Sequence, residues 1–200
     1  MVKVLAINGS YREGGITDQA ISAIAEALEV AGAAVESIAL REYPLQFCLN
    51  CRACTQQAGA VPGKCVHHDG MQELIEKIER ADCYILASPT NMGSVTALFK
   101  RFMERLTVYG YWPWDMNAPR NRKAQTPKKK ALLVSSCAAP GIMGRLLFQT
   151  GKQLKTTAKI MGAEVVGMVF MGMVSKTQQP KLSEGVLTKI NMLADRIGRM

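Results

Sequence analysis

Apolar and polar positions follow two rhythms along this chain, and the two rhythms alternate. Short runs rich in Val, Ile and Leu are typical of buried strands, whereas apolar residues three and four apart indicate one face of a helix. The short runs predict strands over residues 2–7, 34–40, 84–87, 130–135 and 165–171, with Ser88-Pro89 ending the third. The helical spacing predicts helices over residues 17–31, 69–80, 94–106, 141–161 and 182–199.

Five strands separated by helices predict an α/β domain with a parallel sheet and helices on both faces. No internal repeat or linker is visible, so residues 1–200 are read as a single domain. Two segments depart from the alternation: a cysteine-rich loop over 41–68 and an aromatic and basic loop over 107–127. Ligands of such sheets bind at the carboxyl ends of strands. The loops that follow strands one, three and four are therefore the candidates for a site.

Composition narrows the class of protein. Hydrophobic residues make up 48% and charged residues 20% of the 200 residues, as in globular domains. The longest apolar stretch, 163–174, is interrupted by Glu164 and by glycines, and is shorter than the roughly 20 residues that span a membrane. The N-terminus has no secretory-signal pattern. We therefore expect a cytoplasmic protein with no membrane partner.

The net charge of +9 (25 basic against 16 acidic residues) is concentrated locally. Arg120, Arg122 and Lys123 precede the run from Lys128 to Lys130. A solvated loop leading into a strand explains this cluster, and attraction of an anionic nucleotide is an alternative. The chain has no RRM, zinc-finger or helix-turn-helix signature, so nucleic acid is not an expected partner.

The loop after the first strand is short, rich in glycine and opens a helix. Backbone amides at a helix N-terminus favour an anion, and hydroxyl and guanidinium groups add donors. The loop matches neither the P-loop lysine pattern nor G-x-G-x-x-G, which suits the phosphate of a mononucleotide cofactor. The alternative is an ordinary turn with Thr17 as helix cap. The candidate phosphate-binding residues are Ser10, Arg12, Gly14, Gly15, Ile16 and Thr17.

The other two strand-end loops suit a flat ring. After strand three, a proline and a glycine expose backbone amides to the edge of a heteroaromatic system. After strand four, small residues leave room for a ring, and Cys137 is either a reactive thiol or a small packed side chain. The candidate ring-binding residues are Pro89, Thr90, Asn91, Met92 and Gly93, then Ser136 and Cys137.

Two segments, GSYREGGIT at 9–17 and ASPTNMGSVTALFKRFMERL at 87–106, resemble the flavodoxin-like NAD(P)H-dependent FMN reductases. The resemblance implies a three-layer sandwich with a five-stranded parallel sheet in the order 2-1-3-4-5, FMN bound without a covalent link, and NAD(P)H as electron donor. The acceptor would be a flavin, a quinone or another small molecule. Tyr11, Ile16 and Asn91 depart from the family pattern, which has proline, asparagine and an aromatic residue there.

Four cysteines gather in one segment: Cys48, Cys51, Cys54 and Cys65. C-x₂-C-x₂-C spacing with a remote fourth cysteine suits a [4Fe–4S] cluster, and the segment resembles the iron–sulfur flavoprotein branch of the family. A gap of ten residues before Cys65 is longer than that branch leads us to expect. Structural zinc, and free thiols or a redox disulfide, are the alternatives.

Aromatic residues concentrate between Tyr109 and Trp114, which include both tryptophans. Exposed aromatics favour interfaces, so this loop is read as a dimer interface or a lid, or else as a loop folded back on its own chain. The interface reading predicts a homodimer or homotetramer.

These features predict an FMN-binding oxidoreductase with no dedicated catalytic side chain, because the flavin carries the chemistry. One alternative is an electron-transfer flavoprotein, with or without a cluster, that serves a protein partner such as ferredoxin. Another is a flavin-free binding protein on the same fold.

Overall fold

A parallel five-stranded sheet forms the centre of the molecule. The computed structural model describes residues 1–126 and 128–198. The sheet order is β2-β1-β3-β7-β8, the flavodoxin-like arrangement that the resemblance implies. Its strands are β1 (Lys3–Asn8), β2 (Ala34–Ala39), β3 (Cys83–Asn91), β7 (Lys129–Ser136) and β8 (Ala163–Met171).

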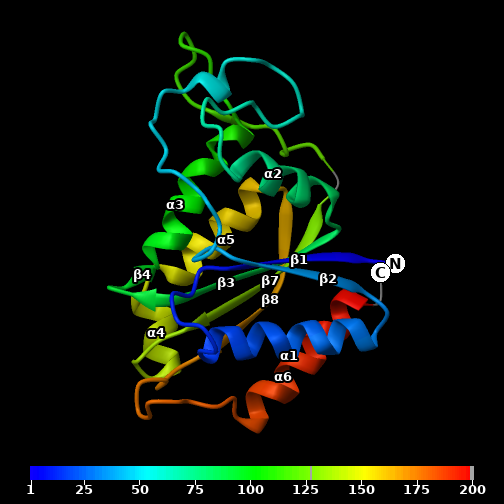
Figure 1. Ribbon diagram of the computed structural model, residues 1–200, viewed down its shortest axis with the longest axis vertical. Coiled ribbons are helices and arrows are strands. Elements are labelled where there is room, and N and C mark those ends of the chain that lie inside the picture. The colour runs from blue at the N-terminus through cyan, green and yellow to red at the C-terminus, as the bar shows by residue number, and fades with distance from the viewer. Residues whose placement is uncertain (127, 199–200) are drawn as a thin grey trace.

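Helices cover both faces of this sheet (Figure 1). On one face lie α1 (Ile16–Val30) and α6 (Glu184–Gly198), and on the other lie α2 (Met71–Arg80), α3 (Ala97–Arg105) and α5 (Thr150–Ile160). Two hydrophobic cores result, one on each face. Successive β3 residues alternate between them, since Ile85 packs in the α1/α6 core and Leu86 in the opposite one. None of the helices described is long and apolar enough to cross a membrane.

The third strand does not end at Ser88-Pro89, so that expectation is wrong. β3 pairs with β1 only as far as Ala87, so at Pro89 the side that faced β1 is an open edge. A proline is tolerated there because no neighbour needs its missing N–H. The chain then turns back as β4 (Ser94–Val95), and the predicted helix begins later, at Ala97.

The helix predicted over 141–161 is two helices. The first, α4 (Gly141–Leu147), ends where Phe148 adopts an extended conformation, and α5 starts at Thr150. The amide of Gln149 donates to the carbonyl of Gly93 at 2.8 Å, so it does not continue the helical ladder. A contact distant in sequence therefore overrides the local pattern. The expected end of the last helix at residue 199 lies outside the described residues.

The two long loops lie together beyond α2 and α3, at the top of Figure 1. The cysteine-rich loop (residues 41–68, the thiol loop) contains the 3₁₀ turn η1 (Ala53–Thr55). The aromatic loop (residues 107–126 here) begins inside the 3₁₀ turn η2 (Leu106–Tyr109) and contains a small ribbon of β5 (Gly110–Tyr111) and β6 (Arg120–Asn121). The amide of Trp112 donates to the carbonyl of Thr55 at 2.9 Å, which joins the two loops.

Candidate functional site

The three strand-end loops meet at one edge of the sheet. β1, β3 and β7 are neighbours, with Asn8 opposite Ala87 and Pro89 opposite Ser136. The first loop (residues 9–17) is held down by Gly9, whose amide donates to the carbonyl of Ala87 at 2.8 Å. A Cβ at Gly9 would lie 2.7 Å from Cβ of Phe99, so only glycine lets the chain cross there. The three predicted segments are thus brought together.

The N-terminus of α1 leaves donors free in the first loop. Gly14 turns the chain with φ +63°, and Gly15 is the N-cap, so Thr17 is not the cap. Within the described chain, nothing accepts a hydrogen bond from the backbone amides of Ile16 and Thr17. The buried hydroxyl of Thr17 lies 3.4 Å from that of Ser136, which links the first loop to the third. Free amides and hydroxyls at a helix N-terminus suit an anion.

Other predicted members of the first loop have partners within the chain. The hydroxyl of Ser10 donates to the carbonyl of Arg12 at 3.1 Å, which holds the turn. The Arg12 guanidinium donates to the carbonyl of Gln178, in the segment after β8. No motif in the sequence predicted a role for that segment, although Gly172 and Pro180 mark it as a connection. A cavity of about 350 Å³ lies between Ile16 and residues 170–186 there.

The acidic residue of this turn is neutralised within the fold. Asp18 accepts hydrogen bonds from the side-chain amide of Asn8 at 2.7 Å and from the amide of Gly14 at 3.0 Å. Its carboxylate also pairs with Arg41 at 3.2 Å. The free amides of the first turn therefore face no unbalanced negative charge from Asp18.

The second segment is a β-hairpin, residues 89–95, instead of a strand-to-helix turn. Asn91 pairs with Ser94 around Met92 and Gly93, whose φ angles of 47° and 76° are those of a type I′ turn. The hairpin is fixed at its base, where the hydroxyls of Thr90 and Thr150 lie 2.9 Å apart. Met92 is fully exposed in a left-handed conformation, a strained placement of the kind found at functional sites.

An apolar surface that the sequence pattern did not predict borders this hairpin. It consists of exposed side chains on α4, namely Ile142, Met143, Leu146 and Leu147, together with Met92. Cys137, in the third loop, is buried, its thiol donates to the carbonyl of Ala139 at 3.2 Å, and burial raises its pKa. It is therefore a packed thiol rather than a reactive one.

The four clustered cysteines all carry free thiols in the thiol loop, away from the strand ends. Burial, followed by the neighbouring charges of Cys65, Cys48 and Cys51, raises the pKa of Cys54 to about 11. Within the described ranges, however, no three His, Cys, Asp or Glu side chains form a group arranged to hold a metal ion.

A buried ion pair anchors the end of the thiol loop. Arg105, the last residue of α3, binds Asp69 with nitrogen–oxygen distances of 2.6 and 3.0 Å, and both side chains are almost fully buried. Burial alone would raise the pKa of Asp69, but hydrogen bonds from Arg105 and from backbone amides lower it to about 2. The same guanidinium donates to the sulfur of Cys65 at 3.5 Å and to the carbonyl of Gln46 at 2.9 Å.

The aromatic loop packs on the thiol loop, which supports the folded-back reading. The Arg52 guanidinium lies 3.8 Å from the ring centre of Trp112 and 4.5 Å from that of Trp114. It also donates to the carbonyls of Trp112 and Pro113 at 2.7 and 3.1 Å. The buried Tyr109 donates to Glu79 at 2.9 Å. Within the chain this loop therefore packs against the segment that carries the cysteines and does not cover the strand ends.

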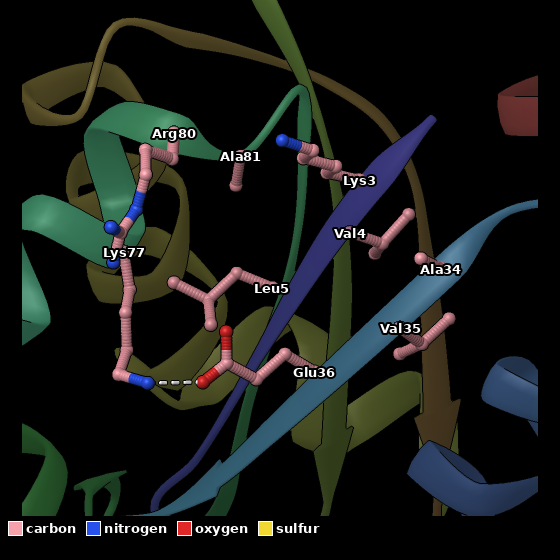
Figure 2. Close-up of a pocket in the computed structure, with 9 residues that line it drawn as sticks. All are labelled: Lys3, Val4, Leu5, Ala34, Val35, Glu36, Lys77, Arg80 and Ala81. Carbon is pink, nitrogen blue, oxygen red and sulfur yellow. Dashed lines mark hydrogen bonds and ion pairs between the residues drawn. The ribbon is translucent and has the colours of Figure 1, made fainter. Parts of the chain in front are cut away.

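A further cavity, of about 430 Å³, lies between the sheet and α2 (Figure 2). It is lined by the first residues of β1 and β2 and by the end of α2, where Lys77 pairs with Glu36. These are the amino ends of the strands. Ligands of open parallel sheets bind at the opposite edge, so we assign no cofactor to this cavity.

Comparison with known protein families identifies the family of this chain. The family model of the NADPH-dependent FMN reductases matches residues 2–177. The chain belongs to this family. The family is one of flavoprotein oxidoreductases, and its membership supports FMN binding at the sheet edge described above.

Individual relatives agree with this placement. An iron–sulfur flavoprotein of Archaeoglobus fulgidus is 34% identical over 112 residues, which are 56% of this chain and 49% of that protein. An iron–sulfur flavoprotein of Methanocaldococcus jannaschii is 34% identical over 104 residues, 52% of this chain and 51% of the relative. The chain thus spans about half the length of the curated relatives it matches. An azoreductase from Bacillus anthracis superimposes with a TM-score of 0.71 at 15% identity, over the full length of both chains, and shows the same fold.

Proposed function

We propose that this protein is an FMN-dependent oxidoreductase that passes electrons from NAD(P)H to a flavin, a quinone or another small acceptor. The observation that carries the proposal is the convergence of the first loop, the hairpin and the third loop on one sheet edge. At this edge, the first amides of α1 have no acceptor in the part of the chain that the structure describes. Family membership supports the same chemistry.

The residues present fit such a cofactor. The amides of Ile16 and Thr17 and the Thr17 hydroxyl would hold the phosphate, and Ser10 and Gly14 would shape the turn around it. The hairpin and residues 136–137 would hold the ring, with hairpin backbone groups at its edge. FMN, when bound, accepts a hydride and releases electrons singly or in pairs. We assign no catalytic side chain, and the protein's part is to bind and orient.

Flavin content and turnover test this function. Anaerobically purified protein is expected to show flavin absorption, to release FMN on denaturation, and to oxidise NADPH or NADH with a quinone or free flavin present. Thr17→Val removes one hydroxyl at nearly constant volume and should weaken FMN binding about tenfold, as expected for a lost hydrogen bond to a charged group. Thr188→Val, on the exposed face of α6, is the matched control. A colourless protein with no affinity for FMN would refute the proposal.

A second candidate is an electron-transfer flavoprotein that also carries a [4Fe–4S] cluster and serves a redox protein. It is favoured by the spacing of the four free cysteines in the thiol loop and by the arginine that donates to Cys65. The names of the relatives support it. When bound, the cluster would exchange single electrons, and Cys48, Cys51, Cys54 and Cys65 would be its ligands.

Iron analysis separates the two candidates. The second predicts about four irons and four acid-labile sulfides per chain, lost in Cys54→Ala and kept in Cys83→Ala, since Cys83 lies in the core of β3. Reduction by ferredoxin but not by NAD(P)H would favour the carrier, and rapid oxidation of NAD(P)H would favour the enzyme. A flavin-containing wild type without iron would rule out the cluster.

We also propose a homodimer or homotetramer. The exposed apolar surface of α4 and Met92 supports association beside the flavin site better than the aromatic loop does, because most of that loop packs internally. Sedimentation velocity of the wild type and of Leu146→Glu tests this. A monomeric wild type would contradict it.

A further inference from the structure

A strap of residues 172–183 (orange in Figure 1) runs from the end of β8 to the start of α6. Near its start, the amide of Met173 donates to the carbonyl of Ala139, in the third loop, at 3.0 Å. The two segments also pack closely, because a Cβ at Gly172 would lie only 2.9 Å from the carbonyl oxygen of Ala139. The beginning of the strap is therefore fixed to the third loop.

The far end of the strap is attached to the first loop by two side chains. The Arg12 guanidinium donates to the carbonyl of Gln178. The side-chain amide of Gln19, in the first turn of α1, donates to the carbonyl of Pro180 at 3.0 Å and to that of Gly14 at 3.2 Å. Gln19 thus binds the strap and the turn before α1 at the same time.

The middle of the strap is exposed. The side chains of residues 175–179 face solvent, and the cavity of about 350 Å³ lies between the strap and Ile16. A segment with few buried apolar contacts opens easily unless other interactions hold it. The attachment of the strap to the first loop therefore depends on the hydrogen bonds near Gln178 and Pro180.

The turn at Gly14 is also held by side chains of the helix that follows it. Gly15, the N-cap of α1, has no side chain to bind the first amides. Asp18 instead accepts a hydrogen bond from the amide of Gly14, and Gln19 donates to the carbonyl of the same residue. The amides at 16–17 follow directly, so their placement depends on this turn. Donors that are already in place bind a ligand more tightly, because less ordering is needed on binding.

We propose that Gln19 is a positioning residue for the phosphate of the flavin, because its two hydrogen bonds hold the strap against the turn at Gly14. Through the strap, the first loop is fixed relative to the third. The inference rests on the proposed FMN-binding function. Both donated hydrogen bonds of the Gln19 amide stay within the chain, so Gln19 acts through the turn and does not itself bind the phosphate. Riboflavin lacks this phosphate, so the effect of Gln19 should appear as a preference for FMN over riboflavin.

Equilibrium dialysis of the full-length protein against a mixture of FMN and riboflavin measures that preference. Gln19→Met removes the amide but keeps the length of the side chain and a good helix former. It should lower the ratio of bound FMN to bound riboflavin about threefold to tenfold, the range expected for lost neutral hydrogen bonds. Gln72→Met makes the same change at an exposed glutamine in the first turn of α2 and should leave the wild-type ratio.

Trypsin digestion tests the attachment itself and needs no bound flavin. The strap carries two exposed cleavage sites, after Lys176 and after Lys181. Gln19→Met should speed cleavage at both sites several-fold, since cleavage follows the population of the open segment, and Gln72→Met should not. Gln19→Asn keeps the amide but shortens its reach by one methylene, so it should behave like Gln19→Met in both measurements. Circular dichroism reports on folding.

A weaker preference for FMN together with faster cleavage in the Gln19 variants supports the inference, and where Gln19→Met does not fold, Gln19→Asn decides. An unchanged preference overturns it even where cleavage is faster, because Gln19 would then hold the strap without serving the phosphate. Unchanged cleavage, or an equal loss of preference in Gln72→Met, overturns it as well. A wild type that binds neither flavin refutes the proposed function and with it the role of Gln19 at the phosphate.

Discussion

Replacing Asp69 with asparagine removes one charge from a buried ion pair while keeping the shape of the side chain. Asp69 binds both terminal nitrogens of Arg105, and the side chains are 4% and 1% exposed. Removing one partner leaves the other charge buried and unpaired, which costs roughly 3–5 kcal/mol. We therefore expect Asp69→Asn to lower the free energy of unfolding by about that amount at pH 7.

The same contact predicts how this difference changes with pH. The pKa of Asp69 falls from 3.8 to about 2 on folding, so the ionised carboxylate stabilises the folded state above its unfolded pKa. At about 1.36 kcal/mol per pH unit, the contribution is about 2.4 kcal/mol. It is lost as pH falls toward 2, with about 1 kcal/mol gone by pH 3. Asparagine does not titrate, so the gap between wild type and variant should narrow on acidification.

Urea unfolding of both proteins, with the thiols kept reduced, at pH 7, 5, 4 and 3 measures this gap. The double variant Asp69→Asn, Arg105→Met is the control, because it removes both charges and should be more stable than Asp69→Asn alone. A loss below 1 kcal/mol at pH 7, or a gap that stays constant from pH 7 to pH 3, would refute the reasoning. Either result would mean that the pair is solvated in solution.

Three further substitutions test the contacts around the two sites. Gly9→Ala should cost about 1–3 kcal/mol in urea unfolding, because its Cβ would meet the Phe99 side chain at 2.7 Å; a neutral effect would contradict that packing. Gly93→Ala should cost about 1 kcal/mol, since the type I′ turn needs φ +76°, whereas Gly185→Ala in α6 should not destabilise. Arg52→Ala removes the contacts between the thiol loop and the two tryptophans, so it should speed proteolytic cleavage in residues 41–68 several-fold and change tryptophan fluorescence. An unchanged digestion pattern would show that these contacts do not stabilise the thiol loop.

Periodicity predicted the strands and most helices because their apolar residues face one of two cores. It failed where a contact distant in sequence decides the backbone. The Gln149–Gly93 hydrogen bond divides one predicted helix, and the open edge beyond β1 lets β3 continue through Pro89. Met92 holds a left-handed conformation that few methionines adopt, so no local signal marked the hairpin.

The candidate sites also contain some residues that the sequence marks and others that it does not. The strand-end loops could be found because glycines, hydroxyls and chain position mark them, and parallel pairing brings them to one edge. The cysteines could be identified as candidate ligands from their spacing in the sequence. Their arginine partners were not, because Arg105 and Arg122 lie 40 and 68 residues from the cysteines they contact.

Those arginines also explain how a long irregular loop is held in a compact domain. Backbone carbonyls that make no ladder still need donors when buried, and a guanidinium supplies five in a rigid fork. Arg122 satisfies carbonyls in both long loops, and Lys129 does the same for three carbonyls at the end of α2. Arg122 and Lys129, which contribute to the net charge of +9, therefore bind backbone carbonyls inside the fold. Carbonyl oxygens do not neutralise these cations, so the buried charges still contribute to the field around the molecule. Only the exposed lysines and arginines, however, can contact an anionic nucleotide or an acidic partner directly.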